Sequence, residues 1–267
     1  TGRSGQIGRA FGPHGMTAGR TDPASAERRA GVVRAGLVQL NVSDDPALNL
    51  PVTLDLIRKA TAGGAAWVLT PEATNILGAS RETQERLLQV ESADPTLAAL
   101  RDEARALGIW LLIGSLSLKT DEPGEDRFAN RSFLIGPDGG IRARYDKLHM
   151  FDVTVSEHES YRESAAFRPG ARAVLAEGPM PVGMSVCYDL RFAYLYRALA
   201  QAGAEVLTVP AAFNDTTGAA HWEVLLRSRA IETGCYVLAP AQCGLHATHF
   251  DPDRPPRRSH GHSLAVD

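Results

Sequence analysis

The chain has 267 residues, of which 44% are hydrophobic and 22% charged, so it is long enough for one large domain or two small ones. Its net charge of −3 and pI near 6.2 argue against nucleic acid or an anionic membrane as the main partner, and no apolar run approaches the roughly 20 residues of a membrane-spanning helix. Three cysteines are too few for a disulfide framework, which favours a reducing, cytoplasmic location.

Residues 1–32 are rich in Gly and Arg and almost free of bulky apolar side chains. Such a segment cannot bury enough surface to offset its chain entropy, so we expect a disordered or expression-derived tail. Residues 33–267 contain no internal repeat and no break in composition. We therefore predict one domain over 33–267.

The first half of this domain alternates between strand and helix patterns. Asp94 followed by Pro95 is a typical helix start, and Gly108 is a typical helix end. The apolar patterns predict strands at 33–40, 66–70 and 109–116, and helices at 46–61 and 94–107.

The second half begins with a hairpin signal, because two strand-like segments flank the turn sequence Pro-Asp-Gly-Gly at 137–140. Residues 151–170 have no periodicity, so we expect a long surface loop there, and residues 244–260 contain Pro, Arg and His without any pattern. The remaining patterns predict strands at 205–209, 235–240 and 261–267 and a helix at 218–231. Alternating strands and helices with one hairpin imply a mixed sheet covered by helices.

Cys187 lies where an apolar strand gives way to a helical pattern, in the stretch Gly183–Arg191 (GMSVCYDLR). Free backbone N–H groups and the helix dipole at such a turn favour a thiolate, which is a nucleophile. Taken alone, the same cysteine is more often a small buried core residue. The choice depends on whether other parts of the chain supply a base and an oxyanion donor.

A cysteine nucleophile needs a group that accepts its proton and a group that stabilises the oxyanion. In a papain-like arrangement the base is a histidine, for which His149 and His221 are candidates. Glu72 and Lys147 are placed better, because each directly follows a predicted strand. Side chains beyond the C-terminal ends of strands converge on the ligand crevice in open α/β folds.

Three short motifs occur in the order Glu, Lys, Cys: Thr-Pro-Glu at 70–72, Tyr-Asp-Lys-Leu-His at 145–149 and Val-Cys-Tyr-Asp-Leu-Arg-Phe at 186–192. In these motifs the chain resembles the nitrilase superfamily of carbon–nitrogen hydrolases. The flanking segments 198–210, 220–232 and 261–263 resemble its Nit branch of amidases. The resemblance extends over residues 33–267.

This resemblance implies an αββα four-layer sandwich with two mixed sheets and a catalytic set of Glu72, Lys147 and Cys187. Glu72 is then the general base, Cys187 forms a thioester with the acyl group, and Lys147 with the backbone N–H of Tyr188 stabilises the oxyanion. A second glutamate of the family precedes Ser and a later Pro-Gly, which identifies it here as Glu163. No metal or organic cofactor is implied.

The resemblance also implies a small amide substrate, which we expect to carry a carboxylate, and assembly into at least a homodimer. An arginine is expected to neutralise the carboxylate, and Asp189 is expected to pair with Arg191 at the turn. The candidate substrate-binding residues are Arg131, Tyr188, Arg191, Phe213 and His221, with Arg162 as a further possibility for the carboxylate.

Two alternatives remain open at this point. The first is a catalytically idle interaction protein on the same fold, and the second is hydrolysis of a nitrile or a carbamoyl group. The cysteine and histidines from Cys243 to His262 suggest zinc, but their spacing matches no closed site, so we expect no metal. Family members continue past the position of Asp267 with Pro-Trp-Gly and another strand, so we expect this sequence to be truncated at its C-terminus.

Overall fold

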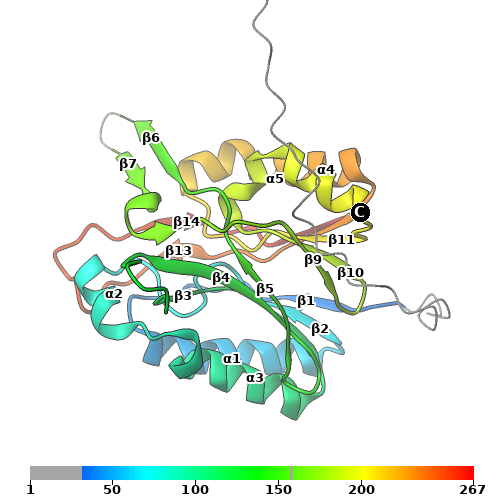
Figure 1. Cartoon of the computed structure of the whole chain (residues 1–267), viewed down its shortest axis with the longest axis horizontal. Helices are drawn as coiled ribbons and strands as arrows, with labels where there is room; N and C mark the ends of the chain where they lie inside the picture. The colour runs from blue at the N-terminus through cyan, green and yellow to red at the C-terminus, as the bar shows by residue number, and fades with distance from the viewer. Residues whose placement is uncertain (1–31, 157–158) are drawn as a thin grey trace, which may run out of the picture. The chain divides into compact units, whose positions relative to one another are not determined.

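The computed structural model describes residues 32–156 and 159–267, and the side chains of 155, 156 and 159 are outside the description (Figure 1). Apart from Val32, the predicted tail at 1–32 therefore lies outside the described residues. Residues 33–267 form one compact unit. Within the described ranges, no helix combines the length and the apolar character needed to cross a bilayer.

The first sheet has the strand order β1-β2-β3-β4-β5, and β8 pairs with one end of β4. Strands β1 to β3 are parallel, whereas β3, β4 and β5 are antiparallel, so the sheet is mixed as predicted. Helices α1 and α3 cover its outer face (Figure 1). The bounds are β1 (Ala35–Leu37), α1 (Pro46–Ala62), β2 (Trp67–Leu69), α3 (Pro95–Leu107), β3 (Trp110–Leu118), β4 (Phe128–Ile135), β5 (Ile141–Asp146) and β8 (Phe167–Arg168).

The second sheet has the strand order β15-β12-β11-β10-β9, with a parallel centre and an antiparallel strand at each edge. Helices α4 and α5 cover its outer face (Figure 1). The bounds are β9 (Val174–Glu177), β10 (Pro181–Met184), α4 (Ala193–Gln201), β11 (Val206–Thr208), α5 (Asp215–Thr233), β12 (Tyr236–Ala239) and β15 (Leu264–Val266).

The two sheets pack face to face, and the main core lies between them. Trp67 and Tyr145 from the first sheet belong to the same buried cluster as Val182 and Leu207 from the second. A second cluster fills the space between the first sheet and its helices, where Ile57 and Leu100 pack on Ile113. The predicted αββα four-layer sandwich is therefore confirmed.

The helix ends follow from local chemistry. The side chain of Asp94 accepts a hydrogen bond from Leu97 N at 2.7 Å and so satisfies a free donor at the start of α3. Gly108 ends the helix in the left-handed conformation at φ 63°, which a glycine adopts without steric cost. The predicted boundaries of α1 and α3 agree with these positions to within one residue.

The prediction of one long loop at 151–170 was wrong, and the segment 244–260, in which the sequence showed no pattern, is a loop only in part. Residues 151–170 contain an antiparallel hairpin that projects from the sheets (Figure 1), and residues 244–260 end in a strand. These strands are held by backbone pairing and a few polar side-chain contacts, and their side chains are mostly at least partly exposed, so no alternating apolar pattern marks them. The short helix α2 was also missed. The bounds are α2 (Arg81–Leu87), β6 (Asp152–Ser156), β7 (Glu159–Arg162), β13 (Cys243–Leu245) and β14 (Arg258–His260).

Candidate active site

Glu72, Lys147 and Cys187 come together between the two sheets, although they are far apart in the sequence. Glu72 follows β2, Lys147 follows β5, and Cys187 lies just beyond β10 in the second sheet. Their exposed fractions are 5%, 2% and 8%, so all three are buried. The edge at which these strands end is therefore the candidate site, as strand order and position predicted.

Glu72 is held by three different donors. Its Oε1 accepts hydrogen bonds from Nζ of Lys147 at 3.0 Å and Nδ2 of Asn130 at 2.9 Å, and its Oε2 accepts one from the backbone N of Ala212 at 2.8 Å. The Cys187 thiol lies close enough to the same carboxylate for each group to shift the pKa of the other. Glu72 is thus oriented toward the nucleophile before any substrate binds.

The turn that carries Glu72 depends on a glycine in the neighbouring strand. A Cβ atom at Gly114 would lie 2.0 Å from the carbonyl oxygen of Thr70 and 2.4 Å from Cβ of Pro210. The register of β3 against β4 also shifts here, between Ile113 and Leu116. A side chain at position 114 would displace the segments that lead to both Glu72 and Ala212.

Lys147 is the cation between two carboxylates. Its Nζ lies 3.0 Å from Oε1 of Glu72 and 2.9 and 2.8 Å from the two carboxylate oxygens of Glu163. Glu163 begins a short 3-10 turn, Glu163–Ala165, and also accepts a hydrogen bond from Phe151 N at 2.6 Å. The glutamate identified from the family pattern therefore contacts the predicted lysine.

Cys187 occupies a strained position at the end of β10. Its φ is 52°, in the left-handed region that residues with a side chain rarely adopt, at a cost of roughly 1–2 kcal/mol. Its backbone N donates to Pro210 O at 2.9 Å, which fixes the turn against the segment after β11. Such strain is typical of functional sites, where the surrounding structure holds it.

The resting site holds a thiol, an ionised carboxylate and an ammonium group. Burial raises the pKa of Cys187, the adjacent Glu72 carboxylate raises it further, and the result is well above the usual value. For Glu72, burial raises the pKa, but the charge of Lys147 and hydrogen bonds from Cys187 and Lys147 outweigh it and lower the pKa to about 2. Burial lowers the pKa of Lys147, but Glu163 and Glu72 raise it well above its usual value.

The thiolate expected from the helix dipole is therefore not the resting form. Cys187 belongs to a 3-10 turn, Cys187–Arg191, and α4 begins only at Ala193, so the cysteine is not at the first turn of a long helix. The charges of its immediate neighbours decide the protonation state instead.

Asn130 is a site residue that the sequence reasoning missed. Its Nδ2 donates to Oε1 of Glu72 at 2.9 Å and is 3.3 Å from Oε1 of Glu163, so one amide contacts both carboxylates. Its Oδ1 is buried without a hydrogen-bond partner. The available signal was its position in the strand before the hairpin, because the next strand, β5, leads to Lys147. The two residues are adjacent across this pair of strands, where Lys147 N donates to Asn130 O at 3.0 Å.

Asp189 holds the cysteine turn without the help of Arg191, so the predicted ion pair between them was wrong. Asp189 accepts hydrogen bonds from Tyr145 Oη at 2.7 Å and from Val186 N at 2.9 Å. The backbone N of His149 donates to it at 3.0 Å, and the His149 ring lies 2.6 Å away. The other ring nitrogen of His149, Nε2, contacts the Tyr194 hydroxyl, so both ring nitrogens are engaged and neither is placed as a base for Cys187.

Four of the five predicted substrate-binding residues gather beside Cys187. The guanidinium of Arg191 lies 5.8 Å from the Tyr188 ring centre and 5.6 Å from that of Phe213, and 3.4 Å from Nδ1 of His221. Arg131 lies elsewhere, because its guanidinium is bound by Asp146 at 2.6 Å and by a second carboxylate. We therefore do not retain Arg131 among the candidate substrate contacts.

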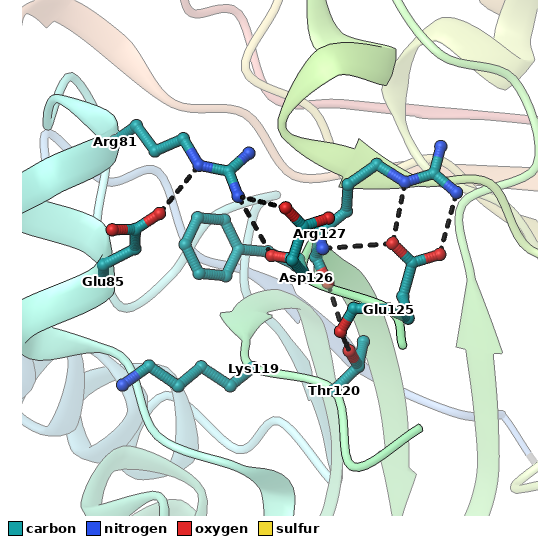
Figure 2. A pocket seen from close by; sticks show the side chains of 8 residues that line it. Arg81, Glu85, Lys119, Thr120, Glu125, Asp126 and Arg127 are labelled. Atoms are coloured by element: carbon teal, nitrogen blue, oxygen red, sulfur yellow. Dashed lines mark hydrogen bonds and ion pairs between the residues drawn. The ribbon is translucent and has the colours of Figure 1, made fainter. Parts of the chain in front are cut away.

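A separate pocket of about 300 Å³ lies on the far side of the Glu163 turn and is shown in Figure 2. None of the four catalytic candidates lines it. Arg81 closes one wall, where it pairs with Glu85 at 2.8 Å and also donates to Ala165 O at 3.1 Å, at the end of that turn. In Figure 2, Lys119 carries no drawn interaction with its neighbours.

Within the described residues, no group of three or more potential metal ligands occurs.

Comparisons with known proteins agree with this geometry. A family model described as carbon–nitrogen hydrolase matches residues 34–267. Deaminated glutathione amidase from Yersinia enterocolitica is 40% identical over 233 residues, covering 86% of this chain and 78% of that protein. The human protein of the same name is 38% identical over 243 residues, covering 86% of this chain and 68% of its own length.

Solved structures are similar over the same region. The Caenorhabditis elegans NitFhit protein superposes with a TM-score of 0.78 at 33% identity, covering 88% of this chain but only 57% of that one. A mutant amidase of the nitrilase superfamily from Nesterenkonia sp. AN1 has a TM-score of 0.70 at 26% identity, covering 88% and 82%. That structure contains the acetamide moiety of fluoroacetamide bound covalently to its active-site cysteine.

Proposed function

This chain belongs to the carbon–nitrogen hydrolase family, and on that premise we propose that it hydrolyses a small carboxylated amide at the site formed by Glu72, Lys147, Cys187 and Glu163. Relatives are named as amidases, and the amidase from Nesterenkonia sp. AN1 carries a covalent adduct on its active-site cysteine. One observation carries the assignment of roles: a single buried carboxylate, that of Glu72, contacts both the Cys187 thiol and the Lys147 ammonium group.

In the first step, Glu72 accepts the thiol proton while sulfur attacks the amide carbonyl carbon. The new S–C bond forms as the C=O π electrons move to oxygen. Because the pKa of Glu72 is low and that of Cys187 is high, this transfer is unfavourable at rest and proceeds only with bond formation. Lys147 and the N–H of Tyr188 would stabilise the oxyanion.

In the second step, the C–N bond breaks, and the leaving nitrogen takes the proton that Glu72 received. The acyl group remains on Cys187 as a thioester. A water molecule then attacks this thioester as Glu72 accepts one of its protons, and the thiol leaves with that proton while the acid is released. Each proton that Glu72 accepts is thus returned within the cycle.

Glu163 and Asn130 support this cycle by position. Glu163 binds Lys147 through both oxygens, which keeps the ammonium group charged and fixed while Glu72 changes protonation. Asn130 contacts both carboxylates and holds them apart on either side of Lys147. The two residues therefore position the base and the oxyanion donor.

For the substrate, we propose an amide that carries at least one carboxylate. Relatives are named for deaminated glutathione, which is such an amide, and short ω-amides such as α-ketoglutaramate share the same chemistry. Arg191, close to Tyr188 and Phe213, supplies a cation near the nucleophile, and His221 contacts that cation.

A cytoplasmic location fits the free thiols of this chain.

We also propose assembly into a homodimer through the helices outside the second sheet. Val224 and Ile231 on α5 and Tyr194 on α4 are exposed there, whereas apolar side chains on the inner face of these helices are buried. Sedimentation of the purified chain should give twice the monomer mass, and charged substitutions at Val224 and Ile231 should reduce it to the monomer mass.

The test of the amidase proposal is an acyl adduct on Cys187. Brief exposure to an amide substrate, followed by acid quench and mass spectrometry, should show the acyl mass on the peptide containing Cys187. Cys187→Ala should abolish both adduct and ammonia release while the fold is kept. Cys235→Ala, at a buried thiol whose Sγ is 3.0 Å from Ala204 O, is the matched control. Turnover that persists in Cys187→Ala, or an active control without any adduct, would contradict the mechanism.

A further inference from the structure

Arg257 lies next to the catalytic carboxylate, at the end of the segment 244–260, in which the sequence shows no pattern. Its guanidinium donates a hydrogen bond to the carbonyl oxygen of Ala212. The N–H of the same Ala212 donates to Oε2 of Glu72 at 2.8 Å. One residue therefore connects the Arg257 cation to the catalytic base. After burial, Lys147 and Cys187, Arg257 is a further influence on the pKa of Glu72, which it lowers.

The position of Arg257 is set by strand β14, which follows it directly. Ser259 forms a bridge with Asn214, and His260 N donates to Phe213 O at 3.0 Å. This pairing fastens β14 to the segment after β11, the same segment that supplies Ala212 to Glu72. Arg257 is thus fixed by backbone contacts, and its side chain extends over the Tyr161 ring at 6.0 Å.

The guanidinium of Arg257 has unused hydrogen-bonding capacity. Its Nε is buried and makes no hydrogen bond, and no carboxylate among the described residues forms an ion pair with it. The neighbouring Arg258 differs, because it is exposed and pairs with Asp215 at 3.3 Å. Because Nε is closed off by neighbouring atoms, a ligand would meet this guanidinium at its Nη atoms, and a cation without an ion pair is suited to an anionic ligand.

We infer that Arg257 is a specificity-determining residue that binds a carboxylate group of the amide substrate, an inference that rests on the proposed amidase function. A guanidinium presents planar donors that match the two oxygens of a carboxylate, and such pairs are strong where water is excluded. Arg191 is another cation without a carboxylate partner in the described part of the chain. It is already in contact with two aromatic rings and His221, and lacks a link to Glu72 comparable to Ala212.

The experiment compares two amides of equal length, succinamate and butyramide, which differ by a carboxylate in place of a methyl group. We would measure kcat/KM for both with the wild-type protein and with Arg257→Gln, Arg257→Lys, Arg191→Gln and Arg258→Gln. The ratio of kcat/KM for succinamate to that for butyramide is the readout. Loss of one charged hydrogen-bonded pair should lower this ratio about 10- to 100-fold in Arg257→Gln.

Arg257→Lys should give an intermediate ratio, because lysine keeps the charge but loses the planar pair of donors. Arg258→Gln should keep the wild-type ratio. If Arg257→Gln slows both amides equally and shifts the acidic limb of the pH profile, Arg257 acts only through Glu72 and the inference is refuted. The inference is also refuted if Arg191→Gln lowers the ratio of kcat/KM for succinamate to that for butyramide and Arg257→Gln does not.

These outcomes are separable from failure of the proposed function. A wild-type protein that acylates Cys187 with succinamate satisfies the proposed function, whatever the variants do to the ratio. A wild-type protein that hydrolyses neither amide, and forms no adduct with longer carboxylated amides, overturns the proposed function and this inference with it. Thermal unfolding of each variant shows whether a lower ratio of kcat/KM for succinamate to that for butyramide results from a loss of structure. If Arg257→Gln does not fold, Arg257→Lys serves as the test.

Discussion

Replacing Lys147 by methionine should change how the stability of this protein depends on pH. Lys147 is 2% exposed and lies within 3.0 Å of both Glu72 and Glu163, so the substitution leaves one buried and one partly buried carboxylate without their cation. Methionine has a similar length and keeps the packing. Removing one partner of a buried ion pair typically costs about 3–5 kcal/mol of stability.

The sign follows from the pKa of Glu72. In the wild-type protein this pKa is lowered from 4.5 to about 2, so the ionised group stabilises the fold at pH values above 4.5. That contribution, about 3 kcal/mol by linkage, is lost as the pH falls through the folded pKa. Without Lys147, burial and the Glu163 charge should raise the pKa of Glu72 above 4.5. Stability from Glu72 should then increase as the pH falls.

The assay is urea unfolding of both proteins between pH 4 and pH 8, because urea, unlike guanidinium, adds no ionic strength. The stability difference should be largest near pH 8 and should narrow toward pH 4. Lys119→Met is the matched control, since Lys119 forms no ion pair among the described residues and lies in the separate pocket (Figure 2). A difference between wild type and Lys147→Met that is constant with pH would refute this account.

Two further predictions concern the supports of the site. Asn130→Ala should lower kcat by about 10- to 100-fold with a smaller effect on KM, because it removes a hydrogen-bond donor to a charged group; unchanged steady-state kinetics would contradict this. Gly114→Ala should destabilise the fold by more than about 2 kcal/mol and reduce acylation of Cys187, because its Cβ would meet the Thr70 carbonyl at 2.0 Å. A thermal melt and the acyl-adduct assay would show wild-type values if this contact can relax.

Helices and strands that bury apolar side chains could be predicted from the sequence. Strands whose side chains are mostly exposed could not. Helices α1 and α3 have clear start and stop residues, and β3 is continuously apolar because both of its faces are covered. The hairpin β6–β7 and strand β14 lack that signal. Their strands are held by backbone hydrogen bonds, which any sequence supplies and which leave no periodic pattern to read.

The same distinction applies to the candidate site. Glu72, Lys147 and Cys187 each directly follow a strand and lie in a recognisable motif, so their convergence could be predicted. Asn130 faces the site from within β4, where it stands beside Arg131 and Ser132, so its polarity alone does not mark it as a site residue. Arg257 reaches Ala212 only because β14 pairs with the Phe213 segment, a long-range contact that no local pattern contains.

The protonation state of the site bears on how this nucleophile is controlled. A thiolate at rest would be open to oxidation and alkylation, since the thiolate is the reactive form of cysteine. Here the buried Glu72 carboxylate keeps Cys187 as a thiol, and Lys147 with Glu163 keeps Glu72 ionised and ready to accept a proton. The negative charge that develops on the substrate oxygen arises next to Lys147, so the same cation that lowers the basicity of Glu72 at rest stabilises the transition state. The site therefore generates its nucleophile only as the carbonyl carbon is attacked, and the arrangement of charges, rather than a preformed thiolate, supplies the reactivity.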